Sequence, residues 1–99
     1  MSGIVSVGEN RELVGGDDVV AQARKVFENM ADVLSAAGCS FADVVKVTLF
    51  LTDVADRPLI NPVRQEVFGE ARPASTLVEV SALVIPGARI EVDCVAVLP

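Results

Sequence analysis

The stretch "DDVVAQARKVFENMADVLSAAG" (residues 17–38) decides how this 99-residue chain folds, because it carries one uninterrupted helical pattern. Its apolar residues recur at intervals of three and four and form a single stripe: Ala23, Val26, Phe27, Met30, Val33, Leu34 and Ala37. Asp17 or Asp18 is a suitable N-cap, and Gly38 stands where a helix commonly ends. A helix with one apolar stripe needs a sheet or another helix to cover it.

The segments that follow supply a strand and a second helix. "VVKVTLFL" (residues 44–51) is β-branched and apolar on both faces, which predicts a central strand. "SFAD" before it has capping-box spacing and predicts one helical turn. Because Pro62 disfavours a continuous helix, we expect Asn61 to be the N-cap of a short helix that begins at Pro62 and ends at about Phe68, before Gly69.

The two ends of the chain complete a sheet. Residues 4–7 form a short extended run, and residues 75–83 and 89–97 predict two final strands joined by "VIPGA" with its Pro-Gly turn. The last strand alternates, with Ile90, Val92, Cys94 and Ala96 on one face and Arg89, Glu91 and Asp93 on the other. The order strand, helix, strand, helix, strand, strand predicts a single α+β domain over residues 1–99, with both helices on one face.

The composition excludes several classes of function. The chain has no His, so neither an imidazole base nor a Ser-His or Cys-His nucleophile pair is available. Cys39 and Cys94 lie far apart and predict neither a zinc site nor a redox pair. A net charge of −6 with mostly scattered cations disfavours nucleic acid as a partner. No apolar run approaches the roughly 20 residues of a membrane span, and no signal segment opens the chain, so we expect a cytoplasmic protein.

Three stretches together resemble one known family. "GDDVVAQARKVFENMADVLSAAGCSFADVVKVTLFLTDVAD", "FGEARPAS" and "ARIEVDCVAV" are similar to the reactive-intermediate deaminases (RidA/YjgF), from about Ser2 to Val97. The resemblance implies a chorismate-mutase-like α+β fold with an antiparallel or mixed sheet. It also implies a homotrimer whose sheets line a central barrel, with a ligand cleft at each subunit interface. Members hydrolyse reactive enamines and imines, such as 2-aminoacrylate, to keto acids and ammonia without a metal or organic cofactor.

The resemblance also places candidate site residues. In active members the strand after the second helix begins P-A-R-S, and its arginine clamps the substrate carboxylate. A glutamate on the last strand positions the attacking water and corresponds to Glu91, and a cleft asparagine corresponds to Asn61. The arginine corresponds to Ser75. A hydroxyl in place of two charged bonds of roughly 1.5–3 kcal/mol each would weaken substrate capture by about two to four powers of ten. It would also leave the cleft neutral or negative.

Each candidate residue has a simpler interpretation. Arg89 lies two residues from Glu91 and could replace the missing cation, or it could be a strand-end charge paired with Glu91. Arg72 is a poorer substitute because it precedes Pro73 and, three residues from Ser75, would project from the opposite face of the strand. Asn61 could serve only as a helix cap, Ser75 only as the first residue of a strand, and Glu91 only as an exposed carboxylate.

The sequence leaves two hypotheses about the function. The first is a deaminase-type hydrolase of small carboxylate-bearing metabolites, with altered or weakened activity. The alternative is a non-catalytic metabolite-binding or scaffold trimer. A ribonuclease role, claimed for some relatives, is disfavoured by the acidic charge and the lack of His. Family members usually have two further strands before the start "MSGIVSV" seen here, so the chain is either naturally short or a fragment. A sheet too apolar for two helices to cover predicts self-association, most simply as a trimer.

Overall fold

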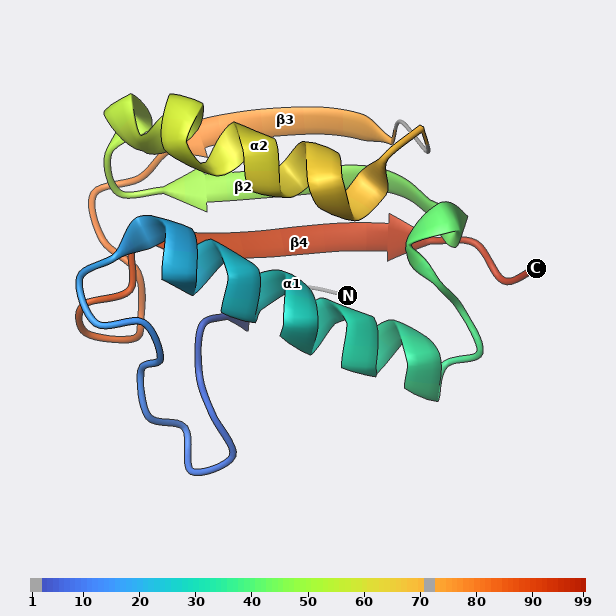
Figure 1. The fold of residues 1–99 in the computed structure, drawn as a ribbon, viewed down its shortest axis with the longest axis horizontal. Coiled ribbons are helices and arrows are strands. Elements are labelled where there is room, and N and C mark those ends of the chain that lie inside the picture. The colour runs from blue at the N-terminus through green and yellow to red at the C-terminus, as the bar shows by residue number, and fades with distance from the viewer. Residues whose placement is uncertain (1–2, 71–72) are drawn as a thin grey trace.

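The computed structural model describes residues 3–70 and 73–99, which form a four-stranded sheet with two helices on one face (Figure 1). The main elements are β1 (Ile4–Val5), α1 (Val19–Ala36), β2 (Val44–Leu51), α2 (Arg57–Phe68), β3 (Ala74–Glu79) and β4 (Ile90–Ala96). Single 3-10 turns precede β2 and α2, at Phe41–Asp43 and Val54–Asp56. The predicted order of elements is confirmed, and so is the position of both helices on one face of the sheet.

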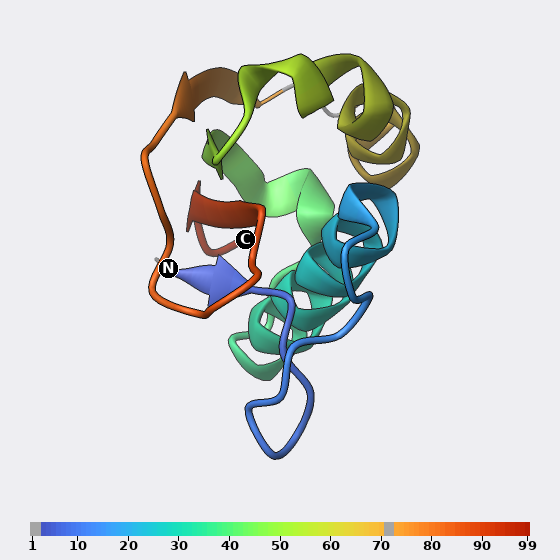
Figure 2. The same ribbon diagram turned by 90° about the vertical axis from the view of Figure 1, so that its left-hand side faces the viewer.

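The sheet is mixed, with the strand order β1-β4-β2-β3. β2 and β3 run parallel, with α2 crossing between them, whereas β4 runs antiparallel to both β1 and β2. The last two strands therefore do not form a hairpin, although a Pro-Gly turn joins them, because the connection passes the end of β2 (Figure 2). β3 ends at Glu79 rather than at the predicted residue 83, since its partner β2 ends opposite it at Leu51.

Helix α1 has the caps that its sequence predicts. The Asp18 side chain accepts hydrogen bonds from the backbone N–H groups of Val20 and Ala21, at 3.0 and 3.2 Å. Gly38 follows the last turn with φ +78°, a conformation that costs glycine little. The helix buries one stripe against the sheet: Val19, Gln22, Ala23, Val26, Phe27, Met30 and Leu34. Val33 and Ala37, at the border of the predicted stripe, are exposed.

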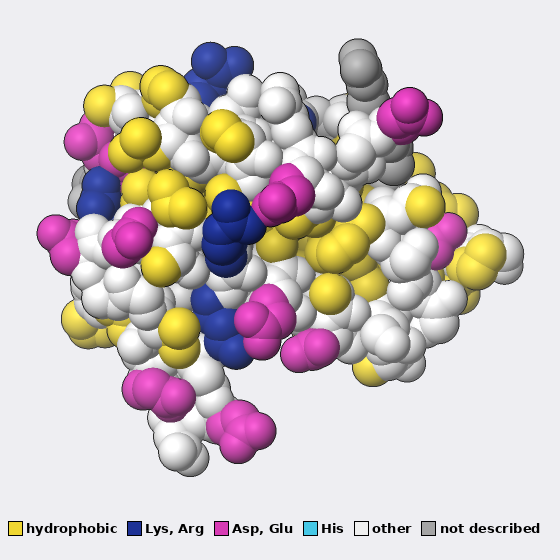
Figure 3. Space-filling view, viewed as in Figure 1, with side chains coloured by type: hydrophobic (Ala, Val, Ile, Leu, Met, Phe, Trp, Pro, Cys, Tyr) yellow, Lys and Arg dark blue, Asp and Glu magenta, His cyan; other side chains and the backbone are white. Residues whose placement is uncertain are grey.

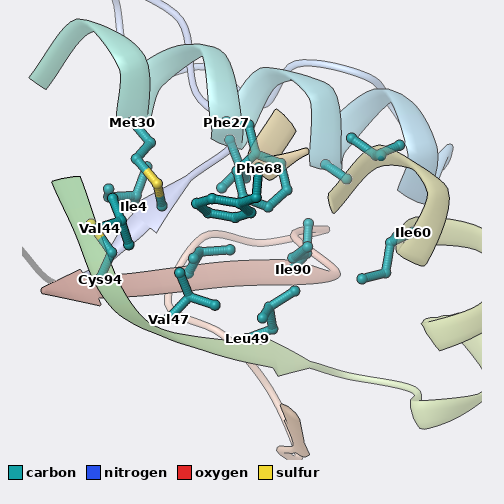
Figure 4. Close-up of a cluster of buried hydrophobic side chains, with 14 of the residues drawn as sticks. Ile4, Phe27, Met30, Val44, Val47, Leu49, Ile60, Phe68, Ile90 and Cys94 are labelled. Atoms are coloured by element: carbon teal, nitrogen blue, oxygen red, sulfur yellow. The ribbon is translucent and has the colours of Figure 1, made fainter. Parts of the chain in front are cut away.

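The core lies between the helices and the sheet (Figure 4). Phe68 at the end of α2 packs edge to face against Phe27 of α1, with ring centroids 5.8 Å apart, and against Phe41 at 5.5 Å. Leu49 of β2 and Ile90 of β4 are fully buried beneath these rings. Both helices are thus fixed to the middle of the sheet.

The prediction that Asn61 caps the second helix is wrong. Helix α2 begins one turn earlier, at Arg57, with Pro58 in its first turn, where the N–H that proline lacks would have no helical partner. Pro62 lies inside the helix and cannot donate the bond that a helix would direct to the carbonyl of residue 58. The additional turn buries Ile60, which is 1% exposed, and this tertiary contact outweighs the local signal of Asn-Pro.

The face of the sheet opposite the helices is open. Its ladder places Val5, Glu91, Phe50 and Val78 side by side across the four strands. Val78 is 38% exposed and Val95, on the same face of β4, is 52% exposed. Neither helix packs on this face (Figure 2). Within the described residues, neither helix is long and apolar enough to cross a bilayer.

Candidate functional site

A pocket between α2 and the β2–β3 edge brings together two of the four predicted site residues. Its volume is about 330 Å³, and its lining consists of Leu49, Arg57, Asn61, Arg64, Ser75 and Leu77. This volume is at the small end of the range of about 300–1,000 Å³ over which ligand pockets occur. Ser75 and Asn61 therefore share one pocket. The family resemblance implies this, whereas a helix cap and the first residue of a strand need not lie together.

The register of the parallel strands positions the floor of this pocket. Ser75 lies opposite Val47 and Leu77 opposite Leu49, and paired residues of neighbouring strands project from the same face. Val47 and Leu49 are fully buried on the helix side, so Ser75 and Leu77 also project toward α2. The leucines give the floor an apolar surface beside the serine hydroxyl.

Helix α2 supplies the polar wall. Arg57, Asn61 and Arg64 are four and three residues apart, and so they lie on one face of the helix. The Arg64 guanidinium donates from Nε and Nη2 to Asn61 Oδ1, at 3.1 and 2.9 Å. These two bonds hold one edge of the guanidinium and fix its orientation.

No carboxylate lines the pocket, and within residues 3–70 and 73–99 neither Arg57 nor Arg64 forms an ion pair. The pocket is therefore cationic although the chain carries a net charge of −6. Our expectation of a neutral or negative cleft is wrong for this pocket. The sequence does not indicate this pair of arginines, because the predicted helix begins at Pro62 and leaves Arg57 outside, so the shared face of Arg57, Asn61 and Arg64 is not apparent.

A second hollow of about 250 Å³ lies between the two helices, but its character is different. Its lining is largely apolar: Arg24, Phe27, Glu28, Ala31, Phe41, Val63 and Val67. Figure 3 shows hydrophobic side chains gathered on this helix-bearing face, with charges of both signs scattered among them. It lacks the convergent polar groups that orient a small ligand, so the pocket between α2 and β3 is the stronger candidate.

Glu91 does not reach this pocket within one chain. It lies on the open face of the sheet, between Val5 of β1 and Phe50 of β2. Burial raises the pKa of the Glu91 carboxyl, and the negative charge of Asp93 raises it further. A carboxyl group with a raised pKa between apolar neighbours is suited to proton transfer, so Glu91 remains a candidate general base.

Arg89 is held elsewhere, and the predicted pair with Glu91 is wrong. Its Nη2 lies 2.8 Å from both carboxylate oxygens of Asp56, and its Nη1 donates to the backbone carbonyl of Asp17 at 2.7 Å. Asp56 is 4% exposed, and its hydrogen bond raises the pKa of Arg89. Arg89 immediately precedes β4, and from there its side chain contacts the residues just before both helices, Asp17 before α1 and Asp56 before α2. Arg72, the weaker substitute, lies outside the described residues.

The part of the chain that the structure describes contains no group of three or more Cys, Asp or Glu side chains placed to hold a metal ion. Cys94 is buried in the core and Cys39 lies at its margin, and neither lines the pocket. The polar side chains that line the pocket offer two guanidinium groups, an amide and a hydroxyl.

Comparison with known proteins gives consistent matches. Residues 1–98 match the family described as Endoribonuclease L-PSP. The chain is 46% identical over 96 residues to 3-aminoacrylate deaminase RutC of Acinetobacter baylyi, covering 97% of this chain and 75% of that protein. It is 38% identical over 86 residues to human 2-iminobutanoate/2-iminopropanoate deaminase, covering 87% of this chain and 61% of that one.

Solved structures agree with the sequence matches. Rv2704 of Mycobacterium tuberculosis, described as a member of the YjgF/YER057c/UK114 family, superposes with a TM-score of 0.83 at 31% identity, covering 95% of this chain and 73% of that one. The chain is shorter than its relatives: it spans from 52% to 75% of the lengths of the curated proteins to which it is 32–49% identical.

Proposed function

Because the chain belongs to the Endoribonuclease L-PSP (RidA/YjgF) family, we propose that it hydrolyses small enamine or imine acids to keto acids and ammonia. The observation that carries the proposal is the cationic pocket in which Asn61 and Ser75 meet two arginines of α2. Such a lining selects an anionic metabolite, and two relatives are named for the deamination of small unsaturated or imino acids.

The hydrolytic step needs a group that takes a proton from water. Glu91 is our candidate, since its apolar surroundings raise its pKa toward the range in which a carboxylate is an effective base. An enamine first takes a proton from solvent at its terminal carbon and becomes the imine. Water then adds to the imine carbon and gives a proton to Glu91, and when that proton is passed to nitrogen the C–N bond breaks, which leaves the keto acid and ammonia. The pocket would hold the substrate carboxylate during these steps.

A site that uses both groups would need a second chain. Ser75 projects from the helix side of the sheet and Glu91 from the open side, so one chain cannot present both to one substrate. We propose a homotrimer in which the open face of each chain packs along the β3 edge of the next, so that Glu91 of a neighbour reaches each pocket. The apolar row of Val5, Phe50 and Val78 favours such an interface. Light scattering should give about three times the chain mass of 10.4 kDa, and a single-chain mass would contradict the assembly.

A second function is favoured by one observation. Ser75 offers a neutral hydroxyl where the resemblance implies an arginine, so the pocket could retain a metabolite without turning it over. A non-catalytic binding trimer is the corresponding proposal, and it shares the pocket and the assembly with the first.

Ammonia release from freshly generated 2-aminoacrylate separates the two functions. We expect release faster than in buffer alone, with a loss of at least about 100-fold in Glu91→Gln. Glu28→Gln, an exposed carboxylate on α1 paired with Lys25, is the matched control and should retain the wild-type rate. Wild-type release no faster than in buffer, with pyruvate still bound, would leave only the non-catalytic function.

A further inference from the structure

We propose that Arg64, oriented by Asn61, holds the carboxylate of a short aliphatic 2-imino or 2-oxo acid in the pocket between α2 and β3. The identity of the ligand rests on the proposed function, whereas the anion site rests on the pocket alone. In this arrangement the helix, and not the residue at position 75, provides the carboxylate anchor.

The hydrogen bonds of Arg64 leave its binding edge available. Nε and one N–H of Nη2 are directed at Asn61 Oδ1, at 3.1 and 2.9 Å. The edge formed by Nη1 and Nη2 remains, and a guanidinium binds a carboxylate through two such parallel bonds. Because Asn61 already fixes the side chain, less rotamer entropy is lost when a ligand binds.

The neighbouring acidic side chains do not compete for this guanidinium. Glu66, on the same helix, pairs with Arg24 of α1 at 2.6 Å. Glu79, at the end of β3, accepts a hydrogen bond from the backbone N–H of Val54 at 2.8 Å. Arg57 adds a second positive charge to the pocket. The local charge is therefore left for an external anion to neutralise.

The other lining residues define the rest of the ligand. Leu49 and Leu77 offer an apolar surface for a short alkyl group, and Ser75 offers one neutral donor or acceptor. A planar carboxylate at one end and a small aliphatic group at the other match this arrangement better than a tetrahedral phosphate, which has no apolar part. Within the class, a two-carbon side chain should bind at least as well as a methyl group.

Calorimetric titration with pyruvate, 2-oxobutyrate and inorganic phosphate tests the proposal on the assembled protein. We expect Arg64→Gln to weaken binding of both keto acids at least about tenfold. Arg64→Lys should also weaken it severalfold, since an ammonium is a point charge without the fork. Arg24→Gln removes the same charge from an exposed ion pair and should leave binding unchanged. In the Arg64→Gln background, Ser75→Arg should restore most of the affinity.

Unchanged keto-acid affinity in Arg64→Gln, with native circular dichroism and assembled mass, would overturn the proposal. Phosphate binding that is as tight and as dependent on Arg64 would overturn the assigned ligand class. Keto-acid binding that depends on Arg64, without ammonia release, would support the anchor and refute the proposed catalysis. Ammonia release that survives Arg64→Gln at the wild-type kcat/KM would refute the anchor and leave the catalysis standing.

Discussion

Replacement of Arg89 by methionine should be among the most destabilising surface changes in this chain. Arg89 bridges Asp56, before α2, and Asp17, before α1, and its side chain is 27% exposed. The substitution leaves the Asp56 carboxylate, 4% exposed, without the Nη2 group that donates to its two oxygens. Removal of one partner of a fully buried pair costs about 3–5 kcal/mol, and because water reaches Arg89 we expect about 2–3 kcal/mol.

A second ion pair provides the matched control. Arg24 and Glu66 are 2.6 Å apart, as close as Arg89 and Asp56, but their side chains are 58% and 64% exposed. Arg24→Met should therefore cost less than about 1 kcal/mol. For a domain of this size, about 1 kcal/mol lowers Tm by 4–8 °C, so Arg89→Met should lower Tm by about 8–24 °C.

Urea unfolding followed by circular dichroism measures both variants at one protein concentration, because association would couple to folding. In a double-variant cycle with Asp56→Asn, the combined loss should be smaller than the sum of the single losses. Equal losses for Arg89→Met and Arg24→Met would refute the reasoning that burial, and not distance, determines the strength of these pairs.

Three further changes test the caps, the pocket and the candidate base. Asp18→Ala should cost about 1 kcal/mol of unfolding free energy in urea and Asp18→Asn much less, and equal losses would contradict capping. Asn61→Ala should weaken pyruvate binding severalfold in a titration. Because Asn61 is not a cap, the same substitution should cost less than about 0.5 kcal/mol of unfolding free energy. A loss of stability as large as that of Asp18→Ala would contradict the helical position of Asn61. Burial and Asp93 raise the pKa of Glu91 above 4.5, so the folded state binds its proton more tightly and stability falls as pH rises from 4.5 through the folded-state value. Glu91→Gln should therefore gain stability relative to wild type as pH rises through that window, and a difference of the opposite sign would contradict the raised pKa.

The parts of the fold that depend on local signals could be predicted from the sequence. Asp18 and Gly38 bound α1 as expected, and the β-branched run of residues 44–51 forms the inner strand β2. The start of α2 could not be predicted in this way, because Pro58 and Pro62 each allow a helix to begin. The burial of Ile60 decides between them, and burial is a tertiary effect.

The site could be predicted only in part. Asn61 and Ser75 were placed in one pocket through the resemblance, and the structure brings them together. The role of Arg64 is not predictable in this way, because the hydrogen bonds that orient its guanidinium depend on Asn61 lying within α2 rather than capping it. The partner of Arg89 is 33 residues away in sequence and on another element, and no local pattern indicates it. Non-local contacts of this kind follow from the topology of the sheet.

The most direct test of the account mixes two inactive variants within one assembly. Ser75→Trp fills the pocket whichever residue anchors the ligand, and Glu91→Gln removes the base from the open face. Each variant alone should release ammonia from 2-aminoacrylate no faster than buffer. Coassembled in equal amounts, they should recover about one quarter of the wild-type rate. Half of the chains have an intact pocket, and half of the neighbours of those chains have an intact Glu91. No recovery, from trimers shown by mass to contain both variants, would contradict a site shared between two chains.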